Sequence, residues 1–116
     1  MKVRFQADAD LNENILLGVI RREPLVDFQS SVLANLNKLN DGLVLALASK
    51  ESRLLVTHDR RTMPHHFAKF ISNQTSFGVL IIPQHLPISQ VLEDLLLIRF
   101  ASSQEDWMNR IASLPL

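Results

Sequence analysis

The apolar positions of the chain recur first at a spacing of two and then at helical spacing. Residues 3–7 alternate apolar with polar side chains, which is typical of a short strand, and this strand ends at Asp8. From residue 11 to residue 20 the apolar side chains recur at intervals of three and four, which predicts an amphipathic helix that Pro24 ends. A weaker strand pattern follows over residues 25–28.

The middle of the chain predicts another helix and another strand. Residues 30–40 are rich in Asn and Ser and predict a short helix or a loop. The Leu- and Ala-rich stretch "DGLVLALASKES", which opens at Asp41, predicts a clear helix. Residues 53–57 then have the composition of a third strand.

The same alternation continues to the carboxyl terminus. Pro64 has the position of a first-turn proline ahead of an apolar stripe, and Pro87 opens a further helix with apolar residues along one side. Between them the nearly continuous apolar run "FGVLIIP" is typical of a strand covered on both faces. Ser102 with Glu105 predicts the cap of a last helix around Trp107, and the tail "IASLPL" predicts a final strand or an arm.

Alternating strands and helices with short connections predict parallel strands joined by right-handed crossovers. The expected fold class is therefore α/β, a three-layer α/β/α sandwich with a mainly parallel central sheet. A chain of 116 residues is long enough for one hydrophobic core and too short for two, so residues 1–116 are expected to form a single domain.

Composition narrows the classes of partner and compartment. The chain holds 12 Lys and Arg and 12 Asp and Glu, so no global field attracts nucleic acid or an acidic membrane, and a polyanionic partner would need a local basic patch. The absence of cysteine excludes a disulfide framework and thiolate metal sites, which fits a reducing compartment. No apolar run approaches the roughly 20 residues of a membrane helix, and the first residues lack an apolar leader. We therefore expect a cytoplasmic protein with no membrane partner.

Acidic residues follow two of the predicted strands. Asp8 ends the first strand, Asp59 follows the third, and Asp41 begins a helix that can face the same edge. In parallel sheets the functional crevice lies off the carboxyl ends of the strands, where the strand order reverses. Carboxylates that converge there repel one another unless a cation lies between them, and hard oxygen ligands suit Mg²⁺ or Mn²⁺. An ion of this kind can activate a water and neutralise charge on a phosphodiester.

Each carboxylate also has a purely structural interpretation. Asp10, three residues before Glu13, has the spacing of a capping box, so an N-cap is its first interpretation. Asp41 can cap the helix that it opens, and Asp8 can form a turn. Asp59 can form an Asx-turn after its strand. The residues alone leave both interpretations open at these positions.

Four stretches carry a resemblance to a known family: "VRFQADADLN", "DGLVLALASKESRLLVTHDRRTMPHHF", "GVLIIPQHLPISQVLEDLLLI" and "WMNRIASLPL". Over nearly the whole chain they resemble the small PIN-like domains, relatives of the VapC-type toxin ribonucleases. The most specific element is the pairing of "F-x-A-D" in the first strand with a later "L-V-T-H-D-R". The resemblance implies a PIN-like parallel sheet and Mg²⁺- or Mn²⁺-dependent cleavage of phosphodiesters, usually in RNA.

The resemblance also implies metal ligands. Asp8 matches the acid of the first strand, and Asp59 matches the aspartate of the "T-x-D" motif. Asp41 matches the middle acid, where PIN nucleases commonly carry Glu. Arg61 stands where a further acid is common in that family, and Asp10 is a candidate to replace it.

Polar residues beside these acids are candidates for catalysis and phosphate binding. The resemblance implies that Thr57 orients Asp59 or a metal-bound water through its hydroxyl. His58 can donate a proton to a leaving oxygen or bind phosphate when protonated, and it can also be an exposed loop residue without either role. Arg60 and Arg61 can bind the RNA backbone or simply balance the acids.

The leading interpretation is a divalent-metal-dependent ribonuclease with a PIN-like fold, acting as the toxin of a toxin–antitoxin system. Its expected partners are an RNA substrate, a small antitoxin protein and a second copy of the chain in a homodimer. The alternative is a PIN-like binding or regulatory module that does not cut, which Arg61 in place of an acid motivates. Nothing in the sequence distinguishes tRNA, mRNA or DNA as the substrate.

Overall fold

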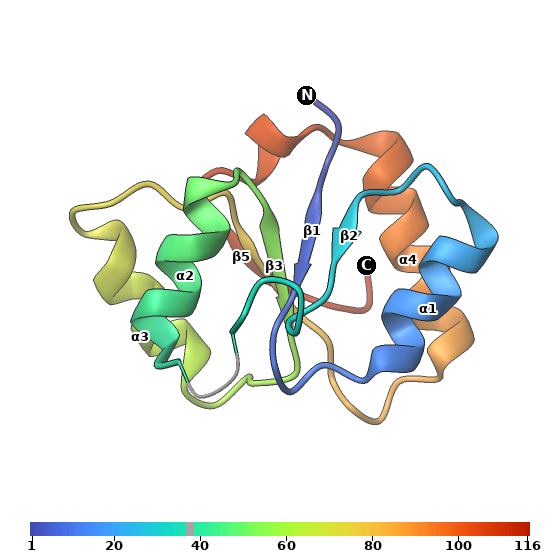
Figure 1. The fold of residues 1–116 in the computed structure, drawn as a ribbon, viewed down its shortest axis with the longest axis horizontal. Coiled ribbons are helices and arrows are strands. Elements are labelled where there is room, and N and C mark those ends of the chain that lie inside the picture. Colours follow the sequence, from blue (N-terminus) through green and yellow to red (C-terminus); the bar gives the residue numbers. More distant parts are fainter. Residues whose placement is uncertain (37–38) are drawn as a thin grey trace.

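A computed structural model describes residues 1–36 and 39–116 of the chain. Strands and helices alternate along it, as the hydrophobic pattern predicts (Figure 1). In chain order the elements are β1 (Phe5–Ala7), α1 (Glu13–Arg22), β2 (Phe28–Gln29), α2 (Asp41–Lys50), β3 (Leu54–Thr57), α3 (Met63–Ile71), β4 (Val79–Ile81), α4 (Ile88–Ala101), the 3-10 helix η1 (Gln104–Trp107) and β5 (Ile111–Ser113).

The five strands form one parallel sheet in the order β2-β1-β3-β4-β5. The chain adds β2 on one side of β1 and then crosses back to add β3, β4 and β5 on the other side. The strand order therefore reverses between β1 and β3, where Ala7 pairs with Val56. In open parallel sheets this reversal leaves a crevice at the carboxyl ends of the two strands, which is where ligands bind.

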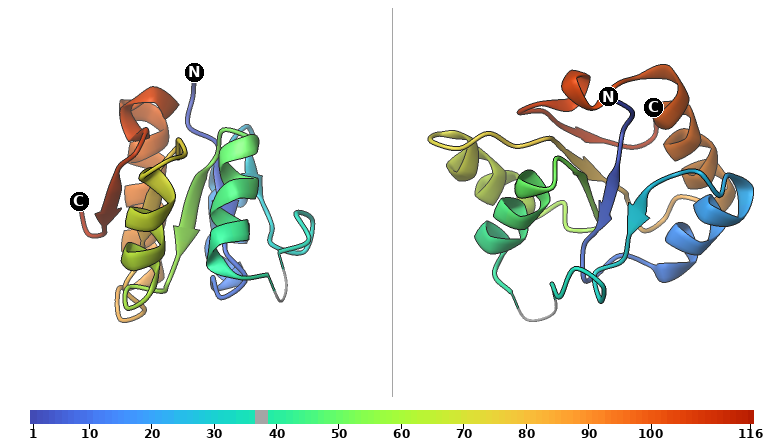
Figure 2. Two further views of the ribbon diagram at one scale, coloured as in Figure 1. Left: turned by 90° about the vertical axis from the view of Figure 1, so that its left-hand side faces the viewer. Right: turned by 45° about the horizontal axis from the view of Figure 1, so that its top comes forward.

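Helices cover both faces of the sheet, which confirms the α/β sandwich class. Helices α1 and α4 lie on one face, and α2 and α3 lie on the other (Figures 1 and 2). Because side chains alternate along a strand, Leu54 and Val56 pack toward α1 and α4, whereas Leu55 packs toward α2 and α3. Strands β3 and β4 are buried throughout, as expected for central strands of a parallel sheet covered on both faces.

Helix α2 begins at Asp41, as the sequence predicts, but the N-caps of α1 and α2 are not the predicted residues. The N-cap of α1 is Asn12, whose side chain accepts a hydrogen bond from the Asn14 N–H at 3.0 Å, so Asp10 is not the cap. The N-cap of α2 is Asn40, which accepts from the Leu43 N–H at 2.9 Å. Asn and Asp cap helices about equally well, so the sequence pattern alone does not separate neighbouring candidates.

Four further details refine the sequence prediction. The second strand covers Phe28–Gln29 rather than residues 25–28, and Leu25 is 82% exposed. Residues 31–35 form turns rather than a helix, and the part of the predicted segment at residues 37–38 lies outside the described residues. The carboxyl-terminal tail contains a true strand, β5. The cap of η1 is a capping box of Ser103 with Asp106, not the predicted pair one residue earlier.

The end of the sheet opposite the crevice is held by a buried arginine. Arg53 precedes β3, and its guanidinium donates to the Phe5 carbonyl at 3.0 Å, to Asp27 at 2.7 Å and to Glu51 at 3.0 Å. These bonds tie the starts of β1 and β3 together. At the start of β4, Gly78 has a φ of 107°, and a Cβ there would lie 2.7 Å from the Trp107 carbonyl oxygen, so only glycine fits.

Within the described residues, no helix has both the length and the apolar character that crossing a membrane requires.

Candidate functional site

The candidate site lies at the carboxyl ends of β1 and β3, where the strand order reverses. Asp8 directly follows β1, and its backbone N–H donates to the Val56 carbonyl of β3 at 2.9 Å. Thr57 is the last residue of β3 and is fully buried. Its side chain and that of Asp8 therefore meet at the crevice that the topology creates.

The Thr57 hydroxyl links three of the acidic residues. It donates to Asp8 Oδ2 at 2.8 Å, and Asp10 Oδ1 lies 3.3 Å from the Thr57 hydroxyl oxygen. The hydroxyl oxygen also accepts the Asp59 N–H at 3.0 Å. One hydroxyl has a single proton to donate, so the shorter bond to Asp8 is the stronger one. The resemblance implied that Thr57 orients Asp59, but the Thr57 proton goes to Asp8, and Thr57 contacts Asp59 by accepting its backbone N–H.

Asp8 is the carboxylate of the site whose pKa is raised. Asp8 is only 8% exposed, and this burial raises its pKa above the ordinary value of an aspartate. The hydrogen bonds from Thr57 and from the Ala9 N–H lower the pKa, whereas the nearby charges of Asp10 and Asp41 raise it further. The pKa is raised overall, so the ionised form of Asp8 costs free energy that a cation beside it would recover.

Asp59 adopts the structural role that the sequence left open. Its Oδ1 accepts the backbone N–H groups of Arg61 at 3.1 Å and Thr62 at 2.9 Å, and its Oδ2 accepts the Thr62 hydroxyl. Burial on its own would raise the pKa of Asp59, but these hydrogen bonds outweigh it and lower the pKa overall. This is an Asx-turn that starts α3, and it engages both carboxylate oxygens of Asp59.

Asp41 is the first residue of α2 and is engaged by a histidine of the neighbouring helix. Its Oδ2 lies 3.3 Å from Nε2 of His66 in α3. No spacing signal in the sequence links Asp41 to His66, because the two residues are 25 positions apart. Asp41 is close enough to raise the pKa of Asp8, so its charge acts on the site although its side chain is turned toward α3.

Asp8, Asp10 and Asp41 line separate cavities. Asp8 lines a cavity of about 240 Å³, Asp10 one of about 260 Å³ and Asp41 one of about 470 Å³. Among residues 1–36 and 39–116, no group of three or more His, Asp or Glu side chains is gathered as a metal site would be. The pair that fits a hard divalent ion best is Asp8 and Asp10, which share one hydroxyl and supply carboxylate oxygens. The structure therefore brings together Asp8, Asp10 and Thr57, and it directs Asp41 and Asp59 elsewhere.

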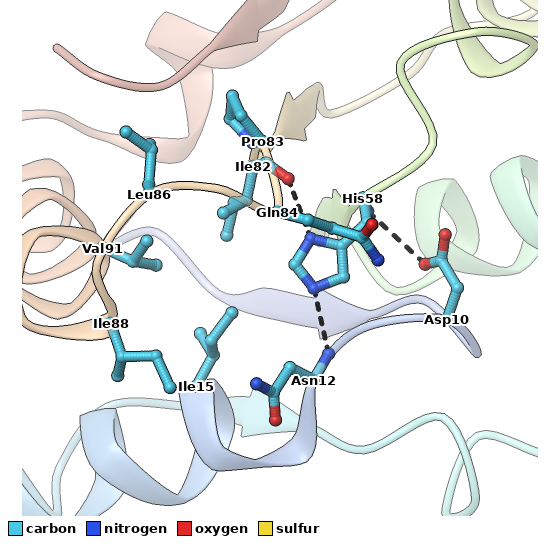
Figure 3. A pocket seen from close by; sticks show the side chains of 10 residues that line it. All are labelled: Asp10, Asn12, Ile15, His58, Ile82, Pro83, Gln84, Leu86, Ile88 and Val91. Atoms are coloured by element: carbon cyan, nitrogen blue, oxygen red, sulfur yellow. Dashed lines mark hydrogen bonds between the residues drawn. The ribbon is translucent and has the colours of Figure 1, made fainter.

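His58 joins three loops at the same edge. Its Nδ1 lies 2.8 Å from the Ile82 carbonyl oxygen at the end of β4, and its Nε2 accepts the Asn12 N–H at 3.2 Å at the start of α1 (Figure 3). A carbonyl oxygen only accepts and an N–H only donates, so these two contacts fit the tautomer of His58 with its proton on Nδ1. Both nitrogens are engaged, which makes His58 a bridging residue of the site.

The two arginines of the candidate phosphate-binding pair lie in the loop between β3 and α3. Arg60 and Arg61 are both exposed, and the backbone of Arg61 is part of the Asx-turn of Asp59. Because both residues are exposed, an anion in solution can approach them.

Comparison of the chain with protein-family models, with curated proteins and with solved structures finds no match. The site itself combines a buried carboxylate with a raised pKa, a second carboxylate on the same hydroxyl, and a histidine that bridges the surrounding loops.

Proposed function

We propose that this chain is a divalent-metal-dependent ribonuclease of the PIN-like kind. The observation that carries the proposal is the pair of Asp8 and Asp10 on the Thr57 hydroxyl, at the point where the strand order reverses. A buried carboxylate beside a second one costs stability in the absence of a cation, so a cation site gives the pair a physical reason.

The residues of the site have distinct roles in this proposal. Asp8 and Asp10 would hold Mg²⁺ or Mn²⁺, with Thr57 fixing the orientation of Asp8. A bound ion of this kind would supply Lewis-acid stabilisation of charge on the phosphodiester and lower the pKa of a water. The exposed Arg60 and Arg61 would bind phosphates of the RNA backbone.

The direct test is cleavage of a single-stranded RNA in the presence of Mn²⁺. We expect Asp8→Asn and Asp10→Asn to lose at least about tenfold in rate, because each removes a charged ligand while keeping the side-chain shape. Glu93→Gln is the matched control, since Glu93 is an exposed carboxylate on α4 outside the site. Equal rates for the wild type, Asp8→Asn and Asp10→Asn would contradict the proposed site.

A second candidate is a PIN-like binding or regulatory module that does not cut. The observation that favours it is the Asx-turn, because both carboxylate oxygens of Asp59 accept hydrogen bonds within it. In addition, Arg61 stands where the PIN-like family commonly has a further acid. Calorimetric titration with Mn²⁺ separates the two candidates. No heat of binding at millimolar metal from a folded protein favours the module, whereas saturable binding that Asp8→Asn abolishes favours the nuclease.

A toxin would be inhibited by a bound antitoxin protein, and the exposed apolar side chains of α4 are the candidate surface for it. Leu97 and Phe100 are exposed one turn apart on this helix. We propose that this stripe binds a small antitoxin protein or a second copy of the chain. Size-exclusion chromatography with light scattering measures the self-association part, and a monomer at every concentration would contradict it.

A further inference from the structure

A cavity of about 260 Å³ lies beside the proposed metal site, between the starts of α1 and α4. Its apolar side is built from branched aliphatic side chains on three elements, including Ile15 of α1, Val91 of α4 and Ile82 after β4. Ile15, Ile82 and Val91 are all buried members of the core, so this wall is rigid. Figure 3 shows these aliphatic side chains gathered on one side of the cavity.

The opposite side of the cavity is polar. It is formed by Asp10, Asn12, His58 and Gln84, which come from three different loops at the carboxyl edge of the sheet. The two hydrogen bonds of His58, to the Ile82 carbonyl and from the Asn12 N–H, hold those loops at fixed positions (Figure 3). The cavity is therefore formed before any ligand enters, which lowers the entropic cost of binding.

The size and charge of the cavity restrict its ligand. A volume of about 260 Å³ is just below the roughly 300–1,000 Å³ of pockets for drug-sized molecules, so the occupant is a single small group. The residues that line it include the carboxylate of Asp10 and neither Lys nor Arg, which disfavours a phosphate inside. An aliphatic wall opposite amide groups suits a flat, neutral ring with hydrogen-bonding edges.

Asp10 connects the cavity to the buried carboxylate of Asp8. Asp10 lines the cavity and lies 3.3 Å from the Thr57 hydroxyl, which in turn donates to Asp8 at 2.8 Å. A nucleotide whose phosphate lies at Asp8 and Asp10 therefore has the cavity within reach of its base. We propose that this cavity is a nucleobase subsite that takes one unstacked base of a single-stranded substrate.

This inference rests on the proposed function for its substrate class, and the chemistry of the polar wall names the base to test first. The carboxamide of Gln84 offers one donor and one acceptor, which pair with the N6 and N7 positions of adenine. Enzymes that bind an unstacked base commonly pack apolar or aromatic side chains against its faces, and here the aliphatic wall with Ile15 and Val91 would pack against one face of the base. Adenosine is therefore the probe, and ribose, which lacks the base, is its control.

Binding of adenosine is measured by NMR, as chemical-shift changes of backbone amides in EDTA. We expect adenosine, and not ribose, to shift the amides of Asn12, Gln84 and Val91. Ile88→Trp would fill the cavity from a position that is 38% exposed, so the core is spared, and it should weaken adenosine binding at least about tenfold. Leu47→Trp places the same ring at an equally exposed position of α2, on the other face of the sheet from the cavity, and should bind adenosine like the wild type.

The readout separates this inference from the ribonuclease proposal, because it needs neither metal nor cleavage. RNA cleavage with Mn²⁺ but no adenosine shifts at the cavity would overturn the base subsite and leave the nuclease intact. Adenosine shifts that Ile88→Trp removes, in a protein that never cleaves RNA, would support the subsite while the nuclease proposal fails. Equal shifts from ribose and adenosine would overturn the assignment of the cavity to a base.

Discussion

The hydroxyl of Thr57 is the contact on which the proposed site depends, and Thr57→Val tests it. Valine has nearly the same shape as threonine, so the substitution removes the hydroxyl and leaves the packing in place. Thr57→Ser is the complementary change, because it keeps the hydroxyl and removes one methyl group. The comparison of the two variants isolates the hydrogen bonds from the packing.

The magnitude follows from the bonds that each variant loses. Thr57→Val leaves the buried Asp8 without its 2.8 Å donor, and a hydrogen bond to a charged group contributes about 1.5–3 kcal/mol. It also removes the acceptor of the Asp59 N–H, an ordinary hydrogen bond of about 0.5–1.5 kcal/mol. We therefore expect the free energy of unfolding at pH 7 to fall by about 2–4 kcal/mol. Thr57→Ser should cost about 1 kcal/mol, the value of one buried methyl group.

Urea denaturation followed by circular dichroism measures both free energies, with the slope of the transition checked for equality between variants. The difference between the two variants should shrink as the pH falls toward the raised pKa of Asp8, because a protonated Asp8 no longer presents a charge to the lost donor. A Val variant as stable as the Ser variant at pH 7 would refute this account of the hydroxyl.

Three further predictions use the same methods. Burial raises the pKa of Asp8, so the free energy of unfolding is highest at low pH, where Asp8 is protonated, and it falls as the pH rises through the raised pKa. Asp8→Asn should therefore melt at a higher temperature than the wild type at pH 7 and not at low pH. An unchanged Tm at pH 7 would contradict this account. Arg53→Met should lower the free energy of unfolding by about 1–3 kcal/mol, since it leaves the buried Phe5 carbonyl without that donor, and urea denaturation measures the loss. Gly78→Ala should cost about 1–3 kcal/mol in the same assay, because alanine is strained at a φ of 107° and meets the Trp107 carbonyl, and a neutral effect would show that the loop moves freely.

Hydrophobic periodicity was sufficient for the elements of the fold but not for their order in the sheet. The apolar run of β4 indicated a strand covered on both faces, and burial throughout the strand confirms it. The order β2-β1-β3-β4-β5 depends on which strands pair across long connections, and no local pattern records that choice. Strand β2 was misplaced because it has only two residues, too few for an alternating pattern to mark its ends.

The candidate site was predictable in its residues and less so in their contacts. The acid after β1 and the threonine that ends β3 were both identified, and they are hydrogen-bonded as neighbours on adjacent strands. Asp10 was assigned to the cap of α1 because its spacing fits, but Asn12 takes the cap and leaves Asp10 facing Thr57. The sequence did not indicate that His58 bridges two other loops, since its two partners lie 46 and 24 residues away along the chain.

The parallel topology gathers partial positive charges from the helix starts at one edge of the sheet, although the chain has no net charge. Each α-helix follows a strand and runs back along it, so α1, α2, α3 and α4 all begin at the edge where the strands end (Figure 1). A helix start carries about half a positive charge from its aligned peptide dipoles. Several such charges lie at the edge that also holds Asp8 and its acidic neighbours. A chain with no net charge therefore concentrates opposite charges at one edge, and the helix starts help to hold together carboxylates that would otherwise repel one another.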